Sequence, residues 1–311
     1  MKKKVAAILA AAAVFVSAMP LSAAAADTTA PYVESDTTMN FLVEQGKTYT
    51  FKMTVHGTHA NPNIVMGNGA AFQTREVRKV TENGNDVYYF KVLATGEEGQ
   101  AAGIYTTLPG QPSVKHAVAA IPYVAKARYG ADYTTYKVGE EIAPGEYVLF
   151  PMKLDSDLED DYYGYYALYN SDGSLQNNDM LDGKNARLYV TLKEGQTLQL
   201  EDIRMVAIQN AVRALPDENG NYDPQSSDYG TMYKCGYDLK PGTYTVVYDA
   251  RPEAMEPYNT TYAAIYNTSD YAKFDDPVSS VLLSNGSQQI TIEDGQYLKL
   301  VRGSLIPNLL T

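Results

Sequence analysis

The chain of 311 residues contains no tryptophan, one cysteine and only three histidines. A single cysteine excludes an intramolecular disulfide, and without tryptophan the core signature of antibody domains is also missing. No G-x-S-x-G segment is present, so the sequence offers no nucleophile elbow for a serine hydrolase. Basic residues are scarce as well: 25 lysines and arginines stand against 37 acidic residues, a net charge of −12. Such an acidic surface disfavours nucleic acid and anionic lipid as partners.

The first 26 residues have the pattern of a secretory signal peptide. Three lysines at positions 2–4 precede an apolar run at 5–19, and small residues at 22–26 offer A-x-A cleavage sites. This run is short for a membrane span, so we expect cleavage near Ala26 and no membrane insertion of the mature chain. The mature chain would carry 22 basic and 37 acidic residues, a charge of −15. The end of the chain, GSLIPNLLT, shows no sorting signal, and a secreted protein, extracellular or loosely attached to the cell surface, is expected.

Two segments of the chain repeat each other. The matching pairs are 135–149 with 232–246 and 165–171 with 262–268, both at an offset of 97, and 190–200 with 290–300 at an offset of 100. A duplicated unit of about 80 residues indicates modular construction.

The sequence predicts an all-β chain of three tandem small β-sandwich modules. An immunoglobulin-like module at 38–121 precedes two copies of a related β repeat at 128–215 and 228–307. A weak boundary near 122–133 and a linker at 216–230, rich in Pro, Gly, Asp, Asn and Ser, separate them. In the first module, period-two alternation and regular turn signals predict about seven short strands and no helix. Each repeat is expected to fold around its own core.

Glycines mark the predicted turns of both repeats. Pro144-Gly145 and Pro241-Gly242 fit the centre of a type II turn, in which the glycine takes a positive φ. Glu194-Gly195 and Asp294-Gly295 are expected to form tight hairpins.

These motifs resemble a known group of proteins. The pattern Y-K-x-G-x-x-[IL]-x-P-G-x-Y, closed by GQTLQL or GQYLKL, resembles repeats in secreted and surface proteins of Gram-positive, clostridia-like bacteria. GKTYTFKMT, GNDVYYFKVLATG and GIYTT are similar to the bacterial immunoglobulin-like domains found beside such repeats. The resemblance implies an extracellular location, and it brings neither catalytic residues nor a cofactor.

Three features could carry chemistry. His56, His59 and His116 could share a metal ion, and the acidic residues at 155–161 could bind calcium, but the second repeat lacks that acidic cluster. We expect both to be solvent-exposed loops, with no metal and no cofactor. Cys235 aligns with Val138, which predicts a small buried apolar position rather than a nucleophile. No motif selects a pair of carboxylates, so we expect no catalytic residues and no enzymatic activity.

Tyrosine is the abundant aromatic residue, with 27 copies. Alternation predicts that Leu168 and Ile265 face the cores and that the opposite faces point outward. The outward residues are Tyr165, Ala167 and Tyr169 in the first repeat and Tyr262, Ala264 and Tyr266 in the second. Tyrosine combines an apolar ring with a hydroxyl, which suits interfaces and sugar platforms, although it is also a common strand former.

The sequence therefore predicts a non-catalytic protein with an adhesive, scaffolding or binding role, whose partner is an unknown protein or glycan at the cell surface. An alternative is a carbohydrate-binding protein that uses the tyrosine faces, although the lack of tryptophan counts against it. A secreted hydrolase is a third reading, which would need a deep pocket with converging carboxylates.

Overall fold

The computed structural model describes residues 30–126, 133–154, 162–223, 229–249, 259–273 and 276–308. These residues form strands and two 3₁₀ turns, η1 (Ile208–Asn210) and η2 (Tyr271–Lys273). None of them belongs to a helix long and apolar enough to cross a membrane. The predicted signal peptide and the acidic cluster at 155–161 lie outside the described residues. The predicted all-β class, built from several sheets, is confirmed.

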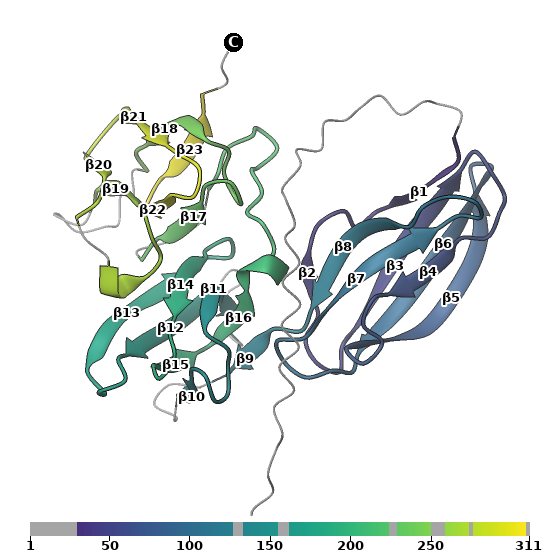
Figure 1. Ribbon diagram of the computed structural model, residues 1–311. Coiled ribbons are helices and arrows are strands. Elements are labelled where there is room, and N and C mark those ends of the chain that lie inside the picture. The colour runs from purple at the N-terminus through teal and green to yellow at the C-terminus, as the bar shows by residue number, and fades with distance from the viewer. Residues whose placement is uncertain are drawn as a thin grey trace, which may run out of the picture.

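The first module is a sandwich of two four-stranded sheets (Figure 1). One sheet has the order β1 (Tyr32–Ser35), β3 (Thr48–His56), β6 (Asn85–Ala94) and β5 (Phe72–Glu82). The other has the order β2 (Phe41–Leu42), β8 (Val114–Ala120), β7 (Ala101–Thr107) and β4 (Asn63–Met66). Alternate residues of β3 are buried, among them Phe51 and Met53, because every second side chain points between the sheets. The strand β2 pairs in parallel with β8.

The two repeats have the same strand order. We call the sheet that carries the predicted tyrosines the tyrosine sheet and the other the back sheet. In repeat 1 the tyrosine sheet has the order β10 (Thr134–Lys137), β15 (Thr197–Glu201), β12 (Tyr162–Tyr169) and β13 (Leu175–Asp182). The back sheet of repeat 1 has the order β14 (Leu188–Leu192), β11 (Gly145–Lys153), β16 (Ile203–Ala207) and β9 (Tyr123–Ala125). In repeat 2 the tyrosine sheet is β17 (Thr231–Lys234), β22 (Tyr297–Val301), β19 (Thr261–Tyr266) and β20 (Ser279–Leu283), and the back sheet is β21 (Ser287–Ile292), β18 (Gly242–Val247) and β23 (Ser304–Pro307). The strand β9, from the segment that joins the first module to repeat 1, is reduced in repeat 2 to a single bridge between Tyr222 and Leu305 of β23.

The turns at Gly195 and Gly295 are not hairpins. Both glycines have a positive φ, 80° and 81°. The preceding strand, β14 or β21, pairs within the back sheet, whereas the following strand, β15 or β22, pairs within the tyrosine sheet. The turn therefore carries the chain from one sheet to the other, because a turn signal fixes a change of direction and not the pairing partner.

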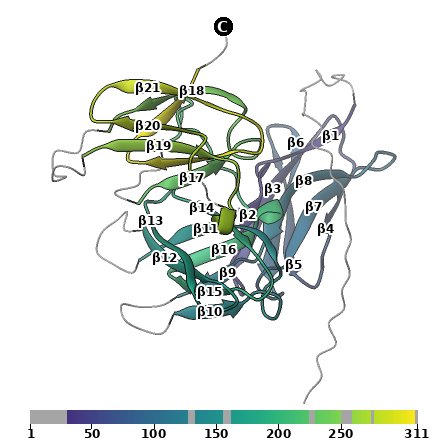
Figure 2. The ribbon, with the colours of Figure 1, turned by 60° about the vertical axis from the view of Figure 1, so that its left-hand side comes forward.

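The back sheet of repeat 1 packs against the tyrosine sheet of repeat 2 (Figure 2). The core cluster of repeat 1 accordingly includes Met232 and Tyr297 from repeat 2, as well as Ala120 from the first module. Tyr233, Leu298 and Leu300, which alternate with those two residues, belong to the separate cluster of repeat 2. Each repeat has a cluster of its own, but the two clusters meet across a packed interface.

Candidate functional site

The four tyrosines predicted as binding residues lie on equivalent strands, β12 and β19. Tyr165, Tyr169, Tyr262 and Tyr266 are all partly buried, between the exposed and the buried class. Leu168 and Ile265 are buried in the cores, so the predicted core face is confirmed. The alanines between the tyrosines, Ala167 and Ala264, are fully buried. Neighbouring side chains therefore cover the floor between the two rings.

In repeat 1 the tyrosine face is lined by hydroxyl and amide groups. Across the ladder, Ala167 lies opposite Gln199 and Asn178, and these residues therefore point to the same side as the rings. The Tyr169 hydroxyl donates a hydrogen bond to Gln199 Oε1 at 3.3 Å, and Asn178 Nδ2 donates to the Tyr165 hydroxyl at 3.2 Å. The face thus combines fixed aromatic rings with amide donors and acceptors.

A third ring extends this face. Tyr133 precedes β10, is 44% exposed and places its ring 5.6 Å from the ring of Tyr165. Sequence reasoning missed Tyr133. Its position, two residues before Thr135 and four before Lys137, places it on the same side of the strand as those residues. Among the described residues, the side chains of Tyr165 and Tyr169 make their ring contacts and hydrogen bonds within repeat 1.

In repeat 2 the same face contacts repeat 1. Lys234, Tyr297 and Tyr266 lie directly opposite one another on β17, β22 and β19. The Lys234 ammonium and the Tyr297 hydroxyl both donate to the carboxylate of Glu146 on β11. Lys299, next along the face, pairs with Asp179 of repeat 1 at 2.7 Å. This half of the face is therefore an interface between the repeats.

Aromatic side chains complete the interface. The rings of Tyr189 and Tyr297 meet at 5.7 Å, and those of Tyr166 and Tyr271 at 6.3 Å. Burial and a hydrogen bond with Tyr262 raise the pKa of Tyr266 to about 12. Tyr262 lies at the open margin of the face, opposite Leu282, which is 68% exposed.

Most of the side chains that bind repeat 1 are replaced in the equivalent face of repeat 1 itself, although Lys234 is retained there as Lys137. The replacements from repeat 2 to repeat 1 are Met232 to Thr135, Tyr297 to Thr197, Lys299 to Gln199 and Val301 to Glu201. The two tyrosines on the central strand are present in both copies. Repeat 1 therefore presents the tyrosines among polar residues with one lysine and one glutamate, whereas repeat 2 presents them beside apolar residues and two lysines.

A buried ion pair lies at the centre of the interface. Asp238 accepts hydrogen bonds from Arg187 Nη1 at 3.0 Å, from the Tyr189 hydroxyl at 2.5 Å and from the backbone N–H of Ala214 and Lys234. The side chains of Arg187 and Asp238 are 8% and 0% exposed. Sequence reasoning missed this pair. The only signal was a difference between the copies, since Glu141 stands at the position of Asp238 and Ser287 at that of Arg187.

The three histidines have separate partners. His56 lies 2.8 Å from Glu34, His59 lies 3.2 Å from Asp86, and His116 lies 2.7 Å from the Thr106 hydroxyl. Among the described residues, no group of three histidine, cysteine or acidic side chains is arranged to hold a metal ion.

Cys235 is buried, as its alignment with Val138 predicts. The residue is 1% exposed, and burial raises the pKa of its thiol to about 11.

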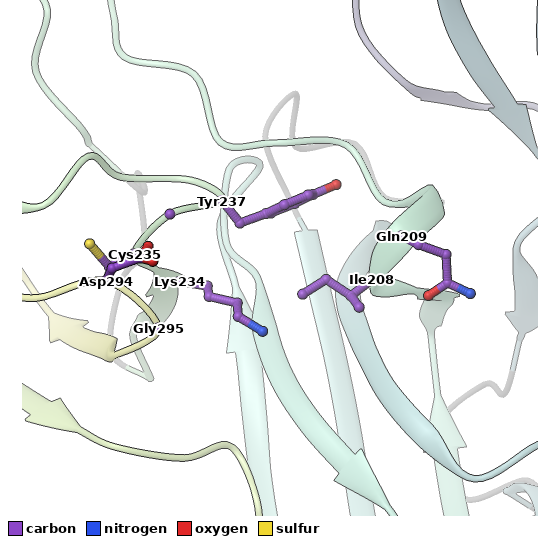
Figure 3. Close-up of a pocket in the computed structure, with 8 residues that line it drawn as sticks. Ile208, Gln209, Lys234, Cys235, Tyr237, Asp294 and Gly295 are labelled. Atoms are coloured by element: carbon purple, nitrogen blue, oxygen red, sulfur yellow. The ribbon is translucent and has the colours of Figure 1, made fainter. Parts of the chain in front are cut away.

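Cys235 lines an open cavity of about 350 Å³ between η1 and a turn of repeat 2 (Figure 3). Asp294 is the one carboxylate in this lining, and Lys234, also in the lining, is paired with Glu146. The cavity thus combines a protonated thiol with one carboxylate and one ion-paired lysine.

The sequence matches no protein-family model and no curated protein. Among solved structures it is similar to SGBP-B from the Bacteroides ovatus mixed-linkage glucan utilization locus, solved in complex with a mixed-linkage heptasaccharide. That match has 11% identity and a TM-score of 0.19, and it covers 88% of this chain and 74% of that one. It is also similar to the Yersinia pseudotuberculosis adhesin InvE, with 12% identity and a TM-score of 0.20, over 59% of this chain and 56% of that one. With TM-scores this low, neither structure assigns a function to this chain.

Proposed function

We propose that the chain is a secreted, non-catalytic protein of the bacterial cell surface or extracellular space that binds a partner through the tyrosine face of repeat 1. One observation carries the proposal: the equivalent face of repeat 2 is used as a binding surface, for repeat 1 itself. Repeat 1 thus carries the same two tyrosines, together with Tyr133, on a face whose ring contacts and side-chain hydrogen bonds among the described residues lie within repeat 1.

The proposed location and the proposed binding role both rest on the sequence. The pattern at residues 1–26 supports secretion, and the resemblance to repeat proteins of Gram-positive, clostridia-like bacteria supports a place at the cell surface. The absence of a catalytic motif from the sequence supports a binding role rather than hydrolysis.

The partner of this face is either a protein or a glycan, and the polar replacements in repeat 1 favour a glycan. Gln199 and Asn178 supply hydrogen-bond groups between Tyr165 and Tyr169, whose positions four residues apart on one strand lie about 13 Å from each other. That spacing suits an extended chain of sugars, and partly buried rings can still offer an edge or a face to a sugar. A protein partner would instead favour the apolar and charged residues found in repeat 2.

The full secreted chain can be tested on a glycan array and in pull-downs from cell-wall and host extracts. The double variant Tyr165→Ala/Tyr169→Ala should weaken binding about tenfold or more, because aromatic anchors dominate such contacts. Tyr32→Ala, which removes a 53% exposed ring from the first module, is the matched control and should bind normally. Selective sugar binding would identify the ligand as a glycan, whereas unchanged binding by a folded double variant would refute the assignment of this face.

A further inference from the structure

A second cavity lies at the junction of the first module and repeat 1. Its volume is about 260 Å³, and three of its eight lining residues are cationic, while none is acidic. The residues that matter here are Leu42 from β2, Phe150 from β11, Lys184 and Arg187 from the loop between β13 and β14, Arg204 from β16, and Val212. This is unusual in a chain with a net charge of −12.

Both arginines have hydrogen-bonding capacity left over. Arg187 Nη1 donates to the Val212 carbonyl at 2.8 Å and to Asp238 at 3.0 Å, but Arg187 Nε is buried and has no partner. Arg204 Nε is likewise buried without a partner, and among the described residues no ion pair is formed by Arg204 or Lys184. Cationic side chains without a counter-charge attract anions, so an oxyanion in the cavity would supply the charge partner that Arg204 and Lys184 lack among the described residues.

The geometry suits a planar anionic group carried on a small carbon skeleton. Phe150 and Arg204 lie directly opposite each other on β11 and β16, so their side chains share one face of the sheet. The Arg187 guanidinium lies 5.4 Å from the centre of the Phe150 ring. Two guanidinium groups beside an aromatic ring can bind oxyanion oxygens while the ring contacts the carbon atoms of the same ligand.

We propose that this cavity binds the carboxylate or sulfate group of a small ligand, such as a uronic acid or a sulfated sugar. Its volume is below the range of about 300–1,000 Å³ that is usual for larger ligands, so it would hold one sugar-sized group. The site involves the back sheet of repeat 1 and the first module, and it is independent of the tyrosine face on the other sheet.

Calorimetric titration of the full secreted chain tests the proposal with sodium glucuronate, sodium sulfate and glucose. Glucuronate, sulfate or both should bind, with an affinity that falls as salt rises, whereas glucose should not bind. Binding of only one anion would identify the oxyanion. Absence of binding by both anions, or equal binding of glucose, would overturn the proposal.

Arg204→Gln is the decisive variant, because Arg204 makes no described ion pair and its loss should leave the fold intact. It should weaken binding of the anion about tenfold. Arg75→Gln removes the same charge from the exposed strand β5 and should bind like the parent chain. If Arg204→Gln melts normally and still binds with the parent affinity, the ligand does not occupy this cavity.

Discussion

At the scale of single residues, Asp238 and Arg187 show how far the two copies have diverged. Replacing Asp238 by Asn should leave the Arg187 guanidinium buried without its counter-charge, and the free energy of unfolding should fall by about 3–5 kcal/mol. Urea denaturation measures this loss. The matched control is Glu141→Gln in repeat 1, since Glu141 is exposed and accepts the backbone N–H of Lys137 in the same way. Equal effects of the two changes would show that the buried ion pair contributes nothing special.

Cys235 gives a second test at this scale. Because burial raises the pKa of the thiol to about 11, a thiol reagent at neutral pH should react slowly with the native protein and rapidly in urea. Cys235→Val, which copies the residue at position 138, should change the stability by less than about 1 kcal/mol. Rapid labelling of the native protein would mean that this position opens readily.

At the scale of elements, two equivalent strands each begin with a glycine whose backbone φ angle is unusual. Gly145 begins β11 and Gly242 begins β18, with φ of 151° and 149°, which other residues rarely adopt. We expect Gly145→Ala and Gly242→Ala each to lower the free energy of unfolding by about 1 kcal/mol. Gly69→Ala has open space around its new methyl group and no positive φ, so it should have no such effect. Thermal melts compare the three variants, and unequal losses at the two equivalent positions would contradict a shared turn geometry.

The sequence predicted elements better than the contacts between them. The 97-residue offset predicted duplicated strands, because repeats conserve the residues that fill each core, such as Leu168 and Ile265. The stacking of the repeats depends on outward residues that differ between copies, such as Tyr297 and Thr197, and a repeat pattern carries no information about those. The predicted type II turns also differ in detail, since a φ near 150° is far from the value of about +80° in that turn.

At the scale of the whole molecule, buried and partly buried tyrosines link stability to alkaline pH. Burial raises the pKa of Tyr136, Tyr147, Tyr237 and Tyr244 to about 12 from the ordinary value of 10.0. A raised pKa in the folded state means that these groups stabilise it fully below pH 10 and lose that contribution between pH 10 and 12. Tyrosinate absorbance and circular dichroism should therefore show loss of structure together with late titration in this interval. Titration of all tyrosines near pH 10 in a folded protein would contradict the burial of these rings.

The stacked repeats lead to a last prediction, for the chain cut within its linker at 216–230. Because Met232 and Tyr297 are buried against repeat 1, and Glu146 binds both Lys234 and Tyr297, the two pieces should stay together after cleavage. A protease site inserted in the exposed turn at 217–220 would allow the cut, and gel filtration would show whether the pieces co-elute. Glu146→Gln combined with Tyr297→Ala should release them, because it removes the negative charge that pairs with Lys234 and the central ring, whereas Thr243→Ala on the opposite side of repeat 2 should not. Thr243 occupies the position of Glu146 in a back sheet whose outward residues are mostly polar, which suits the end of a stack. Separate elution of the parent pieces would mean that the repeats are independent modules joined only by the linker.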